Sequence, residues 1–284
     1  MNYDAFLYPL SELEDCSLCP RNCHANRVKG SVGYCRTGNG FNIASICIHK
    51  GEEPVISGPL GICNIFFTNC NLQCVFCQNH QISDVSRDRT NSGMNLEEVV
   101  SRITDILDTG INMVGFVSPS HVIPQVKVII SVIEHLGYNP VWVYNTNGYD
   151  KPETLRSLEG LIDLYLPDFK YFDSGLASRF SGAPDYPEIA SSSLKEMFRQ
   201  KGSTLILSGE GIAESGIVLR HLILPGQTRN SKDILHFIAN EISPKLHISL
   251  MSQYYPAGDA DSFKGLSRGI TASEYKEVIE EMES

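Results

Sequence analysis

Three cysteines in one short segment have the residue type and the spacing to bind iron. They form the pattern Cys70-x3-Cys74-x2-Cys77, and we call them the loop cysteines. The apolar run from Ile62 to Phe67 precedes them and has the character of a buried strand, so the thiols lie on a loop at its carboxyl end. Three thiolates on one loop can hold three irons of a [4Fe–4S] cluster and leave the fourth iron open. Because catalytic metal sites keep an open position, the pattern predicts a catalytic cluster, with a zinc site or inert buried thiols as alternatives.

Four further cysteines near the amino terminus have the spacing of a second metal site. We call them the N-terminal cysteines: Cys16, Cys19, Cys23 and Cys35. The first three form the pattern Cys-x2-Cys-Pro-Arg-x-Cys, and the fourth is more distant. Four thiolates make a closed tetrahedral site for zinc or iron, or hold an auxiliary iron–sulfur cluster. The spacing leaves zinc, iron–sulfur and free thiols open, and a metal would stabilise a segment too small to fold on its own core.

The composition excludes several classes of partner. The chain has 284 residues, a formal net charge of −10 and a pI near 5.3, which argues against binding to nucleic acid or to an anionic membrane surface. No apolar run approaches the roughly 18 residues of a membrane-spanning helix, and the first ten residues lack the pattern of a secretory signal. Nine cysteines without such a signal fit metal binding in a reducing cytoplasm better than a disulfide scaffold. Two of them, Cys47 and Cys63, lie in apolar stretches and are expected to be buried hydrophobic residues.

Hydrophobic periodicity predicts the elements that position these residues. From residue 61 onward, short apolar runs alternate with segments of helical spacing. The expected strands cover residues 62–67, 112–117, 141–144, 162–166, 217–224 and 246–250, with a further strand near 41–48. Residues 204–207 are either a minor strand or the end of the preceding helix. Six main strands alternating with helices imply parallel βαβ units with right-handed crossovers. We therefore predict an α/β fold, a partial (β/α)6 barrel over residues 61–284, preceded by a cysteine-rich segment over residues 1–60.

Polar residues follow the predicted strands at the edge where parallel sheets bind their ligands. The candidate binding residues are Ser118, Asn145, Thr146, Asp168, Lys170, Arg220, Gln253 and Tyr254. If alternate strand residues face the interior, Arg220 faces inward and suits a carboxylate, while His221 packs between sheet and helix. Gln253 and Tyr254 could stack on adenine, contact a substrate, or lie at a surface edge. His121 is a proton donor, a substrate ligand or a residue that starts a helix.

The loop cysteines resemble those of the radical S-adenosylmethionine (SAM) superfamily. The resemblance rests on their spacing, on Phe76 directly before the third cysteine, and on the strand before the loop. It implies that the open iron chelates the amino and carboxylate groups of SAM, and that the reduced cluster cleaves SAM to a 5′-deoxyadenosyl radical that abstracts a substrate hydrogen. It also implies a reductant such as flavodoxin or ferredoxin as a partner. An iron–sulfur electron-transfer or metal-binding protein that does not cleave SAM is the alternative.

Other segments are similar to the activating enzymes of glycyl radical enzymes, such as pyruvate formate-lyase activating enzyme, and to their PflX-like subgroup. The similar segments are Cys-x-x-Cys-Pro-Arg-x-Cys, Gly51-Glu52-Glu53-Pro54-x-Ile56-Ser57-Gly58, Cys77-Gln78-Asn79 and Leu250-Met251-x-Gln253-Tyr254. This similarity implies a hydrogen taken either from a glycine of a protein substrate or from a small molecule.

The same resemblance implies roles for residues at the strand ends. The segment from Asn145 to Gly148 is similar to an Asp-Thr-Asn-Gly segment near SAM, with Asn145 in place of the acid. Asp168 and Lys170 match an Asp-x-Lys pair whose acid helps to hold a monovalent cation, and Arg220 lies in a segment similar to Val-Arg-x-x-x-x-Pro-Gly. The Gly-Gly-Glu segment that holds the SAM ammonium is absent, so Ser118 and backbone carbonyls are expected to take its place.

Overall fold

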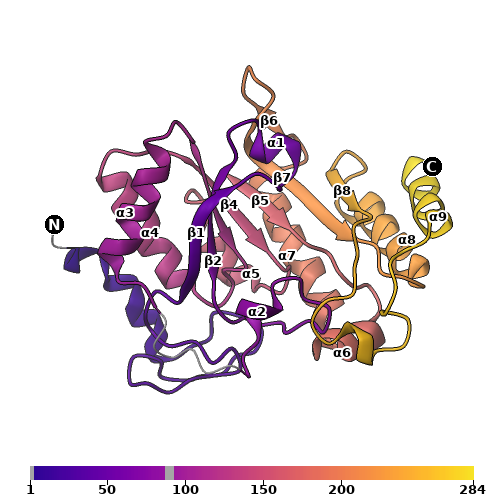
Figure 1. Ribbon diagram of the computed structural model, residues 1–284, viewed down its shortest axis with the longest axis horizontal. Helices are drawn as coiled ribbons and strands as arrows, with labels where there is room; N and C mark the ends of the chain where they lie inside the picture. Colours follow the sequence, from indigo (N-terminus) through magenta and orange to yellow (C-terminus); the bar gives the residue numbers. More distant parts are fainter. Residues whose placement is uncertain (1–2, 87–92) are drawn as a thin grey trace.

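The chain has a mixed α/β fold built on one central sheet (Figure 1). A computed structural model describes residues 3–86 and 93–284. The strands are β1 (Ile43–His49), β2 (Ile62–Phe67), β3 (Met113–Val117), β4 (Val141–Thr146), β5 (Leu164–Pro167), β6 (Ile206–Leu207), β7 (Ala213–Leu222) and β8 (His247–Met251). Their order in the sheet is β1-β2-β3-β4-β5-β7-β6, and β8 also pairs with β7.

Six of these strands are parallel and follow the order of the chain. They are β2, β3, β4, β5, β7 and β8, which confirms the alternation of strands and helices expected from the sequence. β1 runs antiparallel to β2, and β6 runs antiparallel to the first half of β7. Among the residues described, no pairing joins β8 to β1, so the sheet is open and not a closed barrel.

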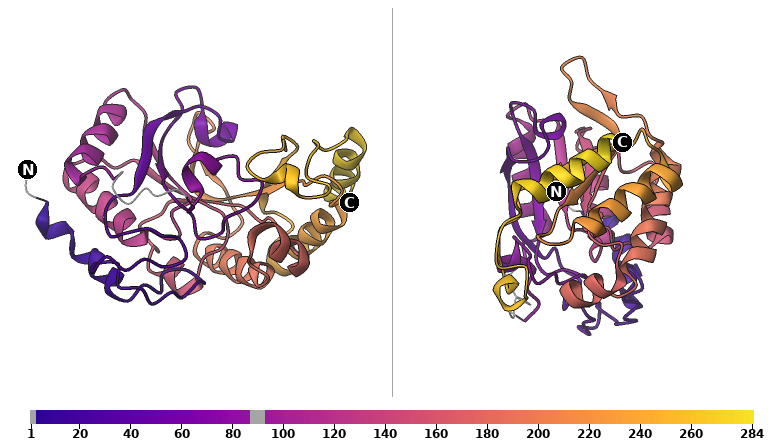
Figure 2. Two further views of the ribbon diagram at one scale, coloured as in Figure 1. Left: turned by 60° about the horizontal axis from the view of Figure 1, so that its bottom comes forward. Right: turned by 90° about the vertical axis from the view of Figure 1, so that its right-hand side faces the viewer.

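Long helices cover one face of the sheet (Figure 2). The helices are α1 (Pro54–Ser57), α2 (His80–Ser83), α3 (Leu96–Leu107), α4 (Ile123–His135), α5 (Pro152–Arg156), α6 (Ser174–Ser181), α7 (Tyr186–Lys201), α8 (Thr228–Phe237) and α9 (Ala272–Glu283). The side chain of Asn95 caps α3 by accepting a hydrogen bond from the backbone of Glu98 at 2.8 Å. Thr271 and Glu274 form a capping box at the start of α9.

Two details differ from the sequence-based expectation, and one open alternative is decided. Helix α6 was not predicted, although Asp173 caps its start and Gly182, in the left-handed conformation, ends it. Residues 206–207 form strand β6 and not the end of a helix, and β7 begins at Ala213 because β6 pairs with its first half. None of the helices in the described part of the chain has the length and apolar character of a bilayer-crossing segment.

Alternate strand residues separate the helix-covered face of the sheet from an inner face. Phe116 and Leu219 point to the helices and belong to the large core cluster. On the inner face, Val143 and Leu164 form a smaller apolar cluster with Ile56 of α1. Two residues further along the strands, the inner face becomes polar. Its polar residues are Asn64, Asn145, Asp168 and Arg220.

The orientations expected for Arg220 and His221 are both confirmed. Arg220 lies on the inner face, where it lines a cavity. His221 is buried on the opposite side, with Nδ1 2.7 Å from the carbonyl of Phe169 and Nε2 2.8 Å from the hydroxyl of Ser231 in α8. Burial lowers the pKa of His221 to about 4, so this histidine is a neutral packing residue between sheet and helix.

The amino-terminal segment packs against the sheet layers. A 3₁₀ helix, Tyr8–Glu14, contacts α4, and Lys127 of α4 pairs with Glu12 at 2.8 Å. Arg27 is only 1% exposed and donates hydrogen bonds to the carbonyls of His121 at 2.7 Å and Gly38 at 2.6 Å. These buried bonds fix the N-terminal cysteines beside the main body of the protein.

Candidate functional site

A cavity of about 360 Å³ opens on the inner face at the carboxyl ends of the parallel strands. It brings together most of the residues selected from the sequence, which come from six different parts of the chain. Those in its lining are Cys70, Cys74, Cys77, Ser118, Asn145, Asp168, Lys170, Arg220 and Gln253. A second cavity, of about 220 Å³, lies between α1 and the β6–β7 hairpin, and no cysteine lines it. The first cavity is therefore the candidate site.

Each sulfur of the loop cysteines accepts a hydrogen bond from a neighbouring side chain. Such bonds favour the thiolate form and orient it, as outer hydrogen bonds do at metal sites. The donors come from the residue directly after β4, from α6 and from α2, so three separate parts of the chain hold the loop. The bonds run from Asn147 Nδ2 to Cys70 at 3.3 Å, from Ser181 Oγ to Cys74 at 3.1 Å, and from Ser83 Oγ to Cys77 at 3.2 Å.

Burial keeps two of these thiols protonated in the absence of a metal. Burial raises the pKa of Cys74 to about 12, although the charge of Lys170 opposes the rise. Burial also raises the pKa of Cys77. Since the thiolate is the metal-binding form, a metal that binds here displaces protons from these sulfurs.

The acidic and thiol side chains of the described residues form no preformed site for a single metal ion. Within residues 3–86 and 93–284, no three His, Cys, Asp or Glu side chains are close enough to share one metal ion. Cys70 and Cys77 are nevertheless near enough to Cys74 for their charges to raise its pKa further. A cluster binds one thiolate on each iron and so needs a wider spacing than a single ion. The loop cysteines thus lie near one another without forming a preformed single-ion site among the described residues.

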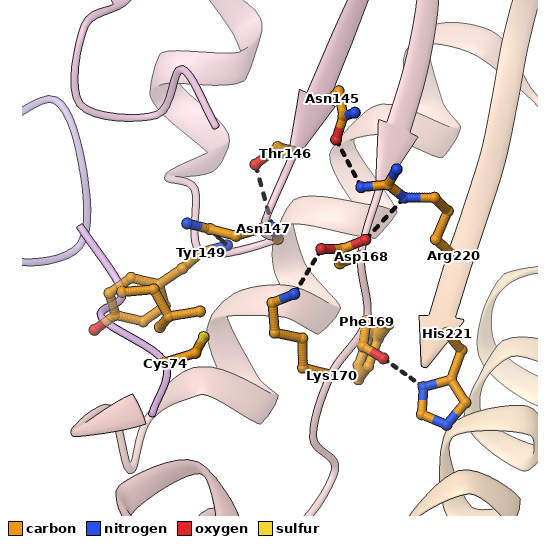
Figure 3. A network of polar contacts seen from close by, with 12 residues as sticks. Cys74, Asn145, Thr146, Asn147, Tyr149, Asp168, Phe169, Lys170, Arg220 and His221 are labelled. Carbon is orange, nitrogen blue, oxygen red and sulfur yellow. Dashed lines mark hydrogen bonds and ion pairs between the residues drawn. The ribbon is translucent and has the colours of Figure 1, made fainter. Parts of the chain in front are cut away.

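The guanidinium of Arg220 is the centre of a polar network beside the loop cysteines (Figure 3). It donates to Asp168 Oδ1 from Nε at 2.9 Å, to Glu52 Oε2 from Nη1 at 3.1 Å, and to Asn145 Oδ1 from Nη2 at 2.7 Å. Lys170 Nζ lies 2.5 Å from Asp168 Oδ2. Burial alone would raise the pKa of Asp168, but the charges of Arg220 and Lys170 outweigh it and hold the pKa below its usual value. The chain itself therefore supplies the positive charge beside Asn145 and Asp168, through the guanidinium of Arg220.

Glu52 lines the cavity, although the sequence indicated it only as part of a similar segment and not as a site residue. Its Oε1 accepts hydrogen bonds from Asn64 at 2.9 Å and from Asn145 at 3.2 Å. It thus supplies a carboxylate next to Asn145, where the resembling family has an acid within the strand. The next residue, Glu53, also lines the cavity, and its Oε2 is buried without a hydrogen-bond partner among the described residues. The sequence pattern that could have indicated both residues is a pair of adjacent acids in the loop after a predicted strand.

Backbone strain is concentrated around the cavity. Ser118, at the end of β3, has φ of 53°, and its backbone N–H donates to the carbonyl of Asn145 at 2.8 Å. Asn69 and Gln73, which flank the first two loop cysteines, have φ of 65° and 61°. Left-handed conformations of non-glycine residues are costly and gather at functional sites. The strain supports a functional role for this loop.

Thr146 and Tyr254 lie outside the cavity lining. The hydroxyl of Thr146 is bound to the buried carboxylate of Asp150 at 2.5 Å, beneath the site. Tyr254 is 5% exposed, its hydroxyl donates to the carbonyl of Leu266 at 2.8 Å, and its ring packs edge-on against Phe76. Tyr254 therefore supports the segment that carries the loop cysteines and lies neither at the cavity mouth nor at a surface edge.

His121 is buried and does not line the cavity. It is 1% exposed and its Nε2 lies 3.0 Å from the carbonyl of Thr68. Burial, and then the charge of Arg27, lower its pKa to about 4. Of the roles left open by the sequence, the structure favours a neutral residue at the start of α4.

The N-terminal cysteines lie together in a segment without regular elements. Cys19 and Cys35 are buried, Cys16 is partly buried and Cys23 is exposed. Burial raises the pKa of Cys19 to about 12, and the charges of the other three cysteines contribute to that rise. Of the two remaining cysteines, Cys63 is fully buried as expected, while Cys47 is only partly buried.

Comparisons with known proteins give one relative and no family assignment. No family model matches the chain. The chain is 28% identical over 272 residues to the uncharacterized protein MJ0674 of Methanocaldococcus jannaschii, a match that covers 94% of this chain and 74% of the relative. A match of this length concerns the chain as a whole and not one motif.

Proposed function

We propose that this chain is a radical SAM enzyme whose cluster is held by Cys70, Cys74 and Cys77. The observation that carries the proposal is that three thiols, each oriented by a hydrogen bond, share one cavity with a network of paired charges. An electron-transfer protein with a fully ligated cluster needs no such cavity beside its cysteines. When bound and reduced, the cluster and SAM together supply a 5′-deoxyadenosyl radical, which abstracts a hydrogen atom from the substrate.

The residues of the chain would bind and orient the reactants. Lys170 and Arg220 bring two cationic donors to the cavity lining, where their remaining N–H groups suit a carboxylate, and Asp168 holds both cations in place. Ser118 and Gln253 offer polar groups at other points of the lining. Phe76 is buried and packs against Tyr254 directly behind the cluster loop, which excludes water from that side.

We further propose that the six parallel strands curve as a partial (β/α)6 barrel around this cavity. Their chain order, the helices on one face and the polar inner face support this arrangement. A cytoplasmic location is part of the same proposal, because all nine cysteines are free thiols and metal-binding thiols persist in reducing compartments. The electron would come from a protein reductant such as flavodoxin or ferredoxin.

The open iron position is tested by electron paramagnetic resonance of the anaerobically prepared, dithionite-reduced protein. Binding of SAM to an open iron changes the cluster signal, so we expect a clear change when SAM is added. A signal that SAM leaves unaltered, in protein with a full iron complement, would contradict the proposal and favour an electron-transfer protein. The Cys47→Ala variant is the matched control, because Cys47 belongs to neither cysteine group.

A further inference from the structure

The carboxylate of Glu53 has a buried oxygen at the cavity that no described residue satisfies. Within residues 3–86 and 93–284, four buried side-chain polar atoms lack a hydrogen-bond partner, and only one of them, Glu53 Oε2, belongs to the cavity lining. Folded proteins pair nearly all of their buried polar atoms, because an unpaired atom loses its bonds to water without a replacement. An unpaired carboxylate oxygen at a cavity therefore suits a donor from a bound molecule.

The charges of the lining leave Glu53 as the carboxylate in excess. Two cationic side chains, Lys170 and Arg220, line the cavity together with three carboxylates. Asp168 pairs with both cations, and Glu52 pairs with Arg220 at 3.1 Å. Although burial opposes the shift, the charges of Asp168, Glu52 and Glu53 raise the pKa of Arg220, so Glu53 lies near this guanidinium without a bond from its Oε2. A bound cation would balance the remaining negative charge.

The backbone holds this carboxylate in a fixed place. Glu53 is the N-cap of α1, and its carbonyl accepts hydrogen bonds from the N–H groups of Ile56 at 2.7 Å and Ser57 at 2.9 Å. Pro54 follows directly and favours an extended conformation of Glu53, which has ψ of 140°. A residue that is already ordered loses little conformational entropy when a ligand binds, so the site is prepared before its ligand arrives.

A primary ammonium group fits both the missing hydrogen bond and the excess charge. It carries one positive charge and three N–H donors. A hard metal ion such as Mg²⁺ needs several oxygen ligands, whereas the carboxylates of Asp168 and Glu52 are already bound to Arg220, whose charge repels such an ion. We propose that Glu53 binds the primary ammonium group of a molecule in the cavity.

Two molecules of the proposed reaction are sources of such a group. SAM carries one, and a substrate with a free amine carries another. That SAM is one source rests on the proposed function, whereas the ammonium site itself rests on the cavity and on the carboxylate of Glu53. The experiment is therefore arranged in two arms that separate the sources.

The first arm measures the affinity for SAM by titration calorimetry of the anaerobically prepared protein with its cluster. If the ammonium group belongs to SAM, Glu53→Gln should bind SAM about tenfold or more weakly than the wild type, as expected for the loss of a charge-assisted hydrogen bond. The SAM analogue that lacks the amino group should bind to both proteins equally. Glu53→Asp keeps the charge and should restore part of the affinity. The control is Glu153→Gln, at an exposed acid outside the cavity, which should bind SAM like the wild type.

The second arm adds n-butylamine, with 1-butanol as its neutral counterpart, to protein saturated with SAM. If the ammonium group belongs to a second molecule, Glu53→Gln binds SAM like the wild type but binds n-butylamine about tenfold or more weakly. If neither compound distinguishes Glu53→Gln from the wild type, the carboxylate holds only water and the inference is overturned. Wild-type protein that binds no SAM contradicts the proposed function, and n-butylamine alone then decides the inference.

Urea denaturation separates ligand binding from a structural role of Glu53. Its Oε2 has no partner among the described residues, so Glu53→Gln should leave the urea midpoint close to that of the wild type. Glu52→Gln, which removes a bonded partner of Arg220, should lower the midpoint clearly. If Glu53→Gln lowers it as much as Glu52→Gln, or prevents folding, then Glu53 is a structural partner of Arg220 and the inference is wrong.

Discussion

Glu52 and Arg220 are 168 positions apart in the chain and form an ion pair at 3.1 Å across the inner face of the sheet. Their side chains are only 9% and 16% exposed. The pair joins the loop after β1 to β7, and Asn145 of β4 bonds to both partners. One carboxylate thereby fixes three separated elements around the cavity.

The variant Glu52→Gln is expected to lower the free energy of unfolding by about 1–3 kcal/mol. The amide keeps hydrogen-bonding capacity but removes the charge that pairs with Arg220, which then retains only Asp168 as an ionic partner. Urea denaturation measures the change. The control is Glu153→Gln, which alters an exposed pair with Arg156 and should change stability by less than about 0.5 kcal/mol. Equal effects of the two variants would show that the Glu52 pair is not structural.

Acid is expected to destabilise the protein through its two buried histidines. The pKa values of His121 and His221 are lowered to about 4, so the unfolded chain takes up these protons first as the pH falls. Each histidine makes its full contribution to the free energy of unfolding above the pKa of the unfolded chain, near about 6.5. That contribution falls by up to about 3 kcal/mol per histidine as the pH falls toward 4. Unfolding curves at several pH values measure this slope. The variant His221→Gln should flatten it, and an unchanged slope would contradict the assignment.

The hydrogen bond from Ser181 to Cys74 is expected to raise the reduction potential of a cluster bound there. Reduction adds negative charge to the sulfurs, and a donor stabilises that charge. Ser181→Ala should therefore lower the midpoint potential by about 40 mV, the one-electron equivalent of roughly 1 kcal/mol. A redox titration followed by electron paramagnetic resonance measures the potential. Ser192→Ala, at an exposed serine of α7, is the control and should leave it unchanged.

Gly148 is expected to be intolerant of a side chain for steric reasons. Its φ is 81°, and a Cβ atom there would clash with the backbone carbonyl oxygen of Asp168. Gly137 has φ of 91° but open space at the same position, so Gly137→Ala reports the conformational cost alone, about 1 kcal/mol. Gly148→Ala should cost clearly more in urea denaturation. Equal costs would mean that the contact between β4 and β5 can relax.

The sequence predicted the features that depend on local patterns. Period-two alternation placed Arg220 inward and His221 outward, because a strand leaves no other choice. The alternation of strands and helices predicted six parallel strands. Because the carboxyl ends of parallel strands lie at one edge of the sheet, it also predicted that the loop cysteines lie near Asp168 and Lys170.

Features that depend on long-range packing were not predictable in this way. Glu52 meets Asn145 across 93 positions, and no local pattern specifies that contact. Tyr254 follows a strand end like Gln253, yet its ring turns away to pack against Phe76. The antiparallel direction of β1 likewise follows from its pairing with β2 and not from its own residues.

The central claim is tested most directly by mass-spectrometric detection of 5′-deoxyadenosine. The protein is prepared anaerobically with its iron–sulfur complement and incubated with SAM and dithionite. We expect slow formation of 5′-deoxyadenosine by the wild type and by Cys47→Ala, and none by Cys74→Ala. No product from wild-type protein that carries its full iron complement, or equal product from Cys74→Ala, would contradict it.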